Sequence, residues 1–355
     1  MIRLLQRWKP LGLGRDVTSE TGIHHGVGFF VVKVVMIGDP TDGGLARSLT
    51  TAFAGLGWDV KLISGEPEGP SWLKRLGYRS RACAQVVAPR NLGQASQHAD
   101  LVLCVKGVFV SPHVIRQLRL LYSCPIVCWN PDDPFDSALS NRGGLLQLSI
   151  PSYDLYVTWS EDVAGKLERV ARSVLVLPFA WDPSRFFPDR FSDCTHDEQA
   201  LLSEARDRPV FVGTWTRERE QWLSSIRDLH PIVFGNRWPR RRGVETRPAL
   251  GGRALRLALG RSAVSLNFLR HQNEHTHNMR TFEIAGCGGR QVAQASREHL
   301  DIAGSLGRMR TFRTEGELRD AVAIRSDDWQ ATNAEWLASN TYAMRVSKLL
   351  NHLSI

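Results

Sequence analysis

Short apolar runs recur along this chain, and helical stretches or polar loops separate most of them. The first unit of this kind consists of an apolar run over 29–37, a loop rich in Gly and Asp over 38–44, a helical stretch to residue 56 and a second strand over 59–63. The order strand, loop, helix, strand predicts a parallel pair, because the helix returns the chain to the edge where the first strand began. A parallel sheet covered by helices on both faces accommodates repeats of this unit.

Two such series follow one another. Further strands of the first are expected over 101–105, 125–129, 154–158 and 173–177, and those of the second over 209–212, 231–234, 263–268, 291–293 and 309–312. Helices are expected over 114–121, 163–170, 217–228, 278–287 and 314–323, and a helical stretch over 331–353 closes the chain. The sequence therefore predicts an α/β protein with two Rossmann-like, doubly wound domains.

The length of 355 residues also suits two domains. A segment rich in proline and aromatic residues over 178–188, followed by a polar stretch over 192–207, indicates the junction. We predict a tail over 1–28, an N-terminal domain over 29–188, a C-terminal domain over 189–330 and a closing helix over 331–355. Three interpretations of the tail stay open: a disordered segment, the product of an upstream start codon, and an anchor at a membrane surface.

The charge balance favours anionic partners. The chain has 45 Lys and Arg against 36 Asp and Glu, a net charge of +9. Phosphorylated ligands, lipid head groups and nucleic acid all fit this balance. Because the basic residues are scattered, with a single run over 240–242, we predict no specific nucleic-acid partner.

The compartment is predicted from the cysteines and the N-terminus. The six cysteines show no C-x-x-C spacing, which is typical of reduced thiols in a cytosolic protein. Residues 1–28 lack the apolar core of a signal peptide, and the nine-residue run over 29–37 is far below the roughly 20 residues of a membrane span. We expect a cytoplasmic protein, with peripheral association at the inner face of the membrane as an alternative.

Ligands of parallel sheets bind at the carboxyl ends of the strands, so the loops after strands are the candidate sites. The loop over 38–44, with Asp39, Gly43 and Gly44, combines backbone N–H groups with a helix N-terminus, which suits a phosphate or a sugar. It matches neither the dinucleotide-binding nor the P-loop pattern. A plain tight turn is the alternative interpretation.

Asp132 and Asp133 follow the strand that ends at residue 129. Adjacent carboxylates can act as a general base or hold a cation. A turn closed by Asx hydrogen bonds explains the same composition.

The segment 213–220 runs from the first strand of the C-terminal domain into its helix and contains Gly213, Thr214, Arg217 and Arg219. Arginine near a helix N-terminus is unfavourable for the helix dipole unless an anion docks there, as a diphosphate would. Pairing of the arginines with neighbouring glutamates is the alternative.

The segment 271–275 matches the H-x-x-E-H pattern of inverted zinc peptidases. That pattern requires a helix with both histidines on one face, but this segment follows a strand and has no apolar periodicity. We therefore predict a polar ligand-binding loop and no metal. A solvent loop and a zinc hydrolase built on His271 and His275 are the alternatives.

The segment 278–289 is the most specific in the chain. Arg280 and Glu283 are three residues apart and share a helix face. Glu283 could hold ribose hydroxyls and Arg280 a phosphate, and a surface salt bridge is the alternative.

These residues resemble the CgeB-like (spore maturation protein) branch of the GT-B glycosyltransferases, whose C-terminal domain is similar to the glycosyl transferase group 1 family. The resemblance covers residues 33 to 350. Its motifs are WNPDDP at 129–134, LPFAWDPSRFFP at 177–188, FVGTW at 211–215 with Arg219, FGNRW at 234–238, SLNF at 265–268, RTFEI at 280–284, GCGG at 286–289 and TYAMRV at 341–346.

The resemblance implies that a sugar is transferred from a nucleotide-sugar donor, in a cleft between two Rossmann-like domains, with no cofactor and no obligatory metal. Glu283 falls at the position of the family's ribose-binding glutamate, and Gly213, Arg219 and Arg280 fall near the diphosphate. The full set of donor-binding candidates is Gly213, Thr214, Arg217, Arg219, Gly235, Asn236, Trp238, Asn278, Arg280 and Glu283.

One position departs from the group 1 pattern. Those enzymes usually carry a second glutamate eight residues before the ribose-binding one, and His275 stands there, with Glu274 beside it. With the two adjacent carboxylates described above, the catalytic candidates are Asp132, Asp133, Glu274 and His275.

The acceptor, which could be a glycan, a lipid-linked molecule, a protein or a small molecule, is expected on the N-terminal domain beside Asp39, Gly43 and Gly44. GT-B enzymes often return the final helix to that domain, which implies the same for 331–355. A non-catalytic protein that binds a nucleotide sugar or an anionic polymer is the alternative function. The sequence indicates no oligomeric state.

Overall fold

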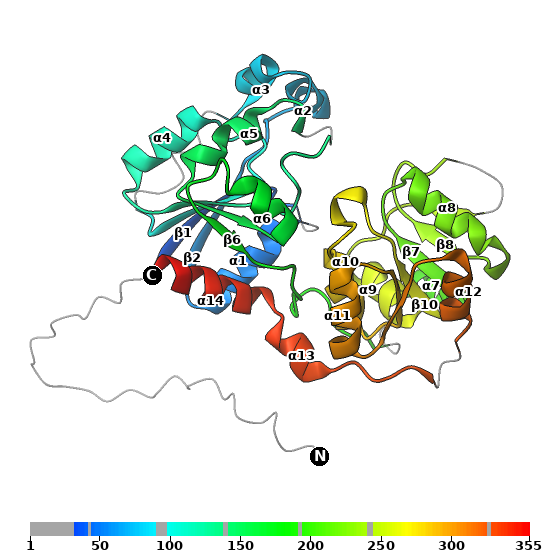
Figure 1. Cartoon of the computed structure of the whole chain (residues 1–355). Coiled ribbons are helices and arrows are strands. Elements are labelled where there is room, and N and C mark those ends of the chain that lie inside the picture. Colours follow the sequence, from blue (N-terminus) through cyan, green and yellow to red (C-terminus); the bar gives the residue numbers. More distant parts are fainter. Residues whose placement is uncertain are drawn as a thin grey trace, which may run out of the picture. The chain divides into compact units, whose positions relative to one another are not determined.

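The computed structural model describes residues 32–41, 44–89, 98–137, 141–190, 194–239, 244–324 and 328–355. The predicted tail over 1–28, Gly43 and the arginine run over 240–242 lie outside the described residues. Residues 32–355 form one compact unit, which contains two six-stranded sheets whose strands all pair in parallel (Figure 1).

The first sheet has the order β2-β1-β3-β4-β5-β6, which reverses direction between β1 and β3. Its strands are β1 (Lys33–Gly38), β2 (Asp59–Ser64), β3 (Leu101–Val105), β4 (Ile126–Trp129), β5 (Leu155–Thr158) and β6 (Val174–Val176). All residues of β3, β4 and β5 are buried, because helices cover a parallel sheet on both faces.

The second sheet has the order β12-β11-β10-β7-β8-β9, which reverses between β7 and β10. Its strands are β7 (Pro209–Val212), β8 (Ile232–Phe234), β9 (Glu245–Arg247), β10 (Val264–Asn267), β11 (Gln291–Gln294) and β12 (Met309–Phe312). Numbered from its own first strand, this sheet has the order of a dinucleotide-binding Rossmann domain, in which ligands bind at the reversal point.

Two of the helices described in the N-terminal half begin at a serine cap, Ser80 before α3 and Ser111 before α4. For example, the Ser111 hydroxyl accepts a hydrogen bond from the Val114 amide, and Pro112 occupies the first turn of α4. The buried face of α4 then carries Val114, Ile115 and Leu118. The helices of this half are α1 (Leu45–Gly55), α2 (Ser71–Gly77), α3 (Arg81–Val87), α4 (Pro112–Leu121), α5 (Leu145–Ser149), the 3-10 helix η3 (Ile150–Ser152) and α6 (Glu161–Leu167).

The C-terminal half contains three helices that the sequence reading did not predict: α7, α9 and α11. Part of the stretch read as a polar junction forms α7, which begins with a capping box between Thr195 and Glu198 and buries Leu202 and Ala205. The elements of this half are α7 (His196–Ala205), α8 (Arg217–Ser225), η5 (Arg227–Leu229), α9 (Gly252–Arg261), η6 (His271–Asn273), α10 (Met279–Gly286), α11 (Arg297–Leu306) and α12 (Glu315–Ala323).

The closing stretch is two helices rather than one. They are α13 (Ala334–Ser339) and α14 (Tyr342–Leu353), and the Thr341 hydroxyl caps α14 by accepting from the Met344 amide. The last helix packs beside α1, and Val346 and Leu349 share a core cluster with Leu49 and Phe53 (Figure 1). In the part of the chain that the structure describes, no helix is long and apolar enough to cross a membrane.

Candidate functional site

A cavity of about 360 Å³ lies at the carboxyl ends of β7 and β10, where the order of the second sheet reverses. We call it the donor pocket. Residues of both halves line it: Pro131, Asp132, Phe179, Phe211, Val212, Gly213, Thr214, Arg219, Asn267, Phe268, Arg270, Gln272, Asn273, Asn278, Met279, Arg280 and Glu283.

Arg219 lies at the back of the donor pocket and is only 7% exposed. Its guanidinium donates to the carbonyl oxygens of Thr214 at 3.0 Å and Phe268 at 2.9 Å, and it lies 5.3 Å from the centre of the Phe211 ring. Its Nε has no partner, and no carboxylate of the described residues is within ion-pair distance of it. Burial, with the charges of Arg270 and Arg280, lowers the pKa of Arg219 to about 10, so the group stays cationic at neutral pH.

Two further arginines line the pocket. Arg280, in the first turn of α10, forms an ion pair with Glu283 at 2.6 Å, and Arg270 follows β10. Three guanidiniums therefore face two carboxylates, Asp132 and Glu283, among the lining residues. This excess of positive charge suits an anionic ligand.

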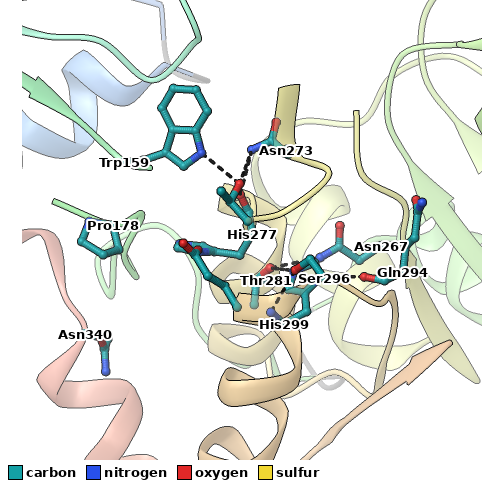
Figure 2. A network of polar contacts seen from close by, with 12 residues as sticks. Trp159, Pro178, Asn267, Asn273, His277, Thr281, Gln294, Ser296, His299 and Asn340 are labelled. Carbon is teal, nitrogen blue, oxygen red and sulfur yellow. Dashed lines mark hydrogen bonds and ion pairs between the residues drawn. The ribbon is translucent and has the colours of Figure 1, made fainter. Parts of the chain in front are cut away.

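A chain of hydrogen bonds runs from His299 through Thr281 to Asn267, which lines the donor pocket (Figure 2). The His299 ring contacts the Gln294 carbonyl oxygen through Nδ1 at 2.7 Å and the Thr281 hydroxyl through Nε2 at 2.9 Å. Since a carbonyl oxygen only accepts, Nδ1 carries the proton and Nε2 accepts from Thr281. Burial lowers the pKa of His299 to about 4, so the ring is neutral and this direction is kept.

The chain continues to the pocket surface. The Thr281 hydroxyl accepts from the side-chain Nδ2 of Asn267 at 3.1 Å. The side-chain Oδ1 of Asn267 in turn accepts from the Nδ2 of Asn278 at 2.8 Å. This orientation leaves the Oδ1 of Asn278 as a buried acceptor without a partner. Asn278 also precedes α10 without capping it through its side chain. A polar ligand group can satisfy both the acceptor and the helix end.

A second set of contacts holds the loop before α10. The Trp159 indole donates to the Thr276 hydroxyl at 3.2 Å, and Asn273 donates to the His277 carbonyl oxygen at 2.8 Å (Figure 2). The ring of His277 is 2% exposed and lies 2.5 Å from the Glu298 carboxylate. Since Trp159 belongs to the N-terminal half, these bonds connect the two halves beside the pocket.

Gly213, Gly235 and Trp238 shape the pocket wall. The Trp238 indole donates to the Gly213 carbonyl oxygen at 2.8 Å, and its ring packs against Phe211. A Cβ at Gly235 would lie 1.9 Å from that same oxygen, so no other residue fits there without a backbone shift. Of the three, Gly213 lines the pocket.

The other donor-binding candidates divide into two groups. Thr214 and Asn278 line the pocket with Arg219, Arg280 and Glu283. Arg217 and Asn236 are exposed and lie outside its lining.

The catalytic candidates also separate. Asp132 lines the donor pocket and contacts the Lys106 ammonium at 2.7 Å and the Gln272 amide at 2.9 Å. Burial opposes its ionisation, but Lys106, these hydrogen bonds and Arg270 outweigh burial and lower the pKa of Asp132. Asp133 is buried, accepts from the Phe135 amide at 2.8 Å and pairs with Lys166 at 2.8 Å, as the turn interpretation expects.

Glu274 and His275 are exposed and lie outside the lining of the donor pocket. Glu274 contacts His271 at 3.2 Å. The segment begins with the 3-10 helix η6 and not with an α-helix, so it lacks the geometry of the inverted zinc motif. Among the described residues, no group of three or more His, Cys, Asp or Glu could hold a metal.

Asp39 and Gly44 line a second cavity, of about 270 Å³, at the reversal point between β1 and β3. Lys106 also lines it, and its backbone adopts a left-handed conformation with φ 69°. Such a conformation costs about 1 kcal/mol or more outside glycine, and it is often kept at functional sites.

The sequence reading missed Arg270, Asn267 and Lys106. Asn267 ends β10, Lys106 directly follows β3, and Arg270 lies in the loop after β10. The rule that ligands bind at the carboxyl ends of parallel strands could therefore have found them. No sequence signal indicates the left-handed backbone of Lys106.

Comparisons with known proteins concern the C-terminal domain and the fold. Residues 217–351, which include the helices α8 and α10 of the donor pocket, match the family model described as glycosyl transferase-like. No curated protein sequence matches the chain.

Solved structures show the fold of the whole chain. An E. coli structure described as trehalose-6-phosphate bound with UDP-2-fluoro glucose has a TM-score of 0.62 at 12% identity, over 90% of this chain and 98% of that chain. Anabaena HepE in complex with UDP and glucose has a TM-score of 0.59 at 13% identity, over 91% and 99%. The UDP-GlcNAc 2-epimerase of Methanocaldococcus jannaschii has a TM-score of 0.50 at 10% identity, over 90% and 99%.

The chain therefore has the GT-B fold, with a glycosyl transferase-like domain in its C-terminal half. The predicted fold class is confirmed, and so is the prediction of a glycosyltransferase at the level of enzyme class. The epimerase shares the fold, so the reaction details must be argued from the residues.

Proposed function

We propose that this glycosyltransferase binds a nucleoside diphosphate sugar in the donor pocket and transfers its sugar to an acceptor bound in the cavity beside Asp39 and Gly44. The observation that carries the proposal is Arg219. Its buried charge is held by two carbonyl oxygens and an aromatic face, without a carboxylate. A buried cation in this state is stabilised when an anion enters the pocket.

Different lining residues would bind the diphosphate and the ribose of the donor. Arg219, Arg270 and Arg280 would neutralise the diphosphate and the charge that grows on it as the sugar leaves. Glu283, on the same helix face as Arg280, would accept hydrogen bonds from ribose hydroxyls. In this scheme the arginines supply the positive charge that a metal would otherwise bring, so the reaction needs no cofactor.

We propose uracil as the base of the donor. The E. coli structure is described as bound with UDP-2-fluoro glucose and the Anabaena protein as bound with UDP and glucose. Both share this fold, and the excess positive charge at the reversal point of the second sheet suits the diphosphate of UDP.

Asp132 is proposed as a positioning residue. A carboxylate with a lowered pKa is a weak proton acceptor, and Asp132 already holds Lys106 and Gln272. Its contact with Gln272 connects the loop after β4 to the loop after β10. Through Lys106, the same carboxylate orders the wall of the acceptor cavity.

The motifs quoted above support a place in the CgeB-like branch. All six cysteines are free, which fits a reducing compartment, and we propose the cytoplasm. Peripheral membrane association stays a prediction.

A non-catalytic nucleotide-sugar-binding protein is the second candidate. One observation favours it. His275 stands where group 1 enzymes usually carry their first glutamate, and both His275 and the neighbouring Glu274 lie outside the donor pocket. Release of nucleotide from a bound nucleotide sugar, with or without an acceptor, separates an enzyme from a binder.

A thermal-shift panel of nucleotide sugars tests the proposal. A ligand that binds the native state alone raises the melting temperature by mass action, and UDP-sugars should do so. Glu283→Ala should remove this shift, while Glu335→Ala, at an exposed glutamate of α13, should keep it. An equal shift for both variants would contradict the role of Glu283.

A further inference from the structure

A third cavity, of about 590 Å³, lies at the opposite edge of the C-terminal sheet from the donor pocket. Four arginines line it. Arg261, Arg290 and Arg308 stand just before the strands β10, β11 and β12, and Arg206 precedes β7. We call it the basic cavity, and its remaining lining residues are Gln199, Leu202, Ser203, Gly260, Ser262 and Gly288.

No acidic residue lines the basic cavity. None of the four arginines forms an ion pair with a carboxylate of the described residues. Burial, followed by the charge of Arg290, lowers the pKa of Arg308, which places these two guanidiniums within electrostatic reach of one another. Like charges held together in this way favour a bound anion.

Backbone contacts hold three of the four arginines but use few of their donors. Arg308 donates to the Gly288 carbonyl oxygen at 2.9 Å, Arg290 to that of Ala263 at 3.1 Å and Arg261 to that of Asp189 at 2.8 Å. Nε of Arg308 is buried without a partner. Since each guanidinium carries about five N–H donors, most remain available to a ligand.

We propose that the basic cavity binds the phosphate group of a phosphorylated molecule, at a site separate from the donor pocket. Guanidinium groups bind phosphate oxygens in pairs of parallel hydrogen bonds. The cavity volume falls within the range of about 300–1,000 Å³ of small-molecule sites, and exceeds what a lone phosphate fills. Leu202 and the glycines leave room for an uncharged part of the ligand.

The sheet itself separates the two sites. The strands β7 and β10 have four residues each, and about 3.3 Å per residue puts roughly 10 Å or more between their ends. A ligand of the basic cavity therefore does not overlap a donor at the opposite edge.

Helix capping is the competing explanation for these arginines. Arg261 ends α9 and Arg206 follows α7, where cations stabilise the negative end of a helix. Capping predicts lower stability on substitution and no phosphate ligand, whereas the proposal predicts loss of a ligand.

The test is a calorimetric titration with inorganic pyrophosphate in saturating UDP, which under the proposed function occupies the donor pocket. The wild type should bind, and the double variant Arg290→Gln, Arg308→Gln should bind about a hundredfold more weakly, at about tenfold for each arginine. The matched control is Arg116→Gln with Arg169→Gln, which removes two exposed arginines of the N-terminal half and should bind as the wild type does.

Arg206→Gln keeps the test valid if the double variant does not fold. Arg206 is exposed and has no side-chain hydrogen bond to the described residues, so its loss should weaken pyrophosphate about tenfold with little change in melting temperature. Unchanged pyrophosphate binding in both variants, or no binding by the wild type, would overturn the proposal.

Vesicles separate the two sources of phosphate. Binding to phosphatidylglycerol but not phosphatidylcholine vesicles, lost in the double variant, would identify a lipid head group. Pyrophosphate binding without vesicle binding would identify a soluble ligand. Either outcome supports the phosphate site.

Discussion

At the scale of single residues, the donor pocket depends on buried polar groups that their neighbours only partly satisfy. Arg219 keeps a free Nε, and Asn278 keeps a free Oδ1. Such groups cost about 1–3 kcal/mol each when no ligand meets them, and at these two positions a polar ligand is in reach. The sequence predicted both residues, because each stands near a helix N-terminus after a strand.

His299 makes the stability of the folded protein sensitive to acid. Its pKa is about 4 in the folded protein and about 6.5 when unfolded. Between these values the unfolded chain binds more protons, so the free energy of unfolding falls as the pH drops from about 6.5 to about 4 and is unaffected above. The loss should be a few kcal/mol at most.

Urea unfolding at several pH values between 4 and 7 measures this effect. His299→Gln should flatten the acid-side slope, whereas His113→Gln, at an exposed histidine of α4, should keep the slope of the wild type. Identical slopes in all three proteins would show that His299 titrates normally.

At the scale of elements, apolar runs located the strands well. Buried strands such as β3, β5 and β7 appear within a residue of their expected bounds, because both faces of an interior parallel strand must be apolar. Strand β9, with the sequence Glu-Thr-Arg at the sheet edge, carries no such signal and was missed. Helix α9 was missed although it buries Leu257, Ala258 and Leu259, and α11, which buries His299 and Leu306, was missed as well.

The loop after β8 supports the loop after β7 through the contact of Gly235 with Gly213. In Gly235→Ala the new Cβ would meet the Gly213 carbonyl oxygen. Overpacking of this kind costs about 1–3 kcal/mol, and displacement of Gly213 should also weaken UDP binding about tenfold. Thermal unfolding and calorimetry measure the two effects.

Gly304→Ala provides the control. This glycine lies within α11, and a Cβ there meets no atom within 4 Å, so the variant should be stabilised by about 0.5–1 kcal/mol. If Gly235→Ala were equally harmless, the loops after β7 and β8 would be able to move apart freely.

At the scale of the whole molecule, the last helix belongs to the core of the first domain. Leu349 of α14 is fully buried with Leu49 and Phe53 of α1. Arg345 donates to the Pro178 carbonyl oxygen at 3.1 Å, where the chain passes between the two sheets. The break between α13 and α14 was not predicted, because a polar Asn-Thr pair can also lie within a long helix.

Removal of this packing should destabilise the N-terminal half. Leu349→Ala should lower the free energy of unfolding by about 2–5 kcal/mol, whereas Lys348→Ala, at the exposed neighbouring residue, should change it by less than about 0.5 kcal/mol. Denaturant unfolding compares them. Equal stability of the two variants would mean that α14 does not pack as described.

The central claim is that three arginines of the donor pocket bind the diphosphate of a nucleotide sugar. Calorimetric titration of the wild type with UDP and with uridine tests it most directly, because the two ligands differ in the diphosphate alone. UDP should bind at least about a hundredfold more tightly, and added salt should reduce the difference. Equal affinities for UDP and uridine would contradict the claim.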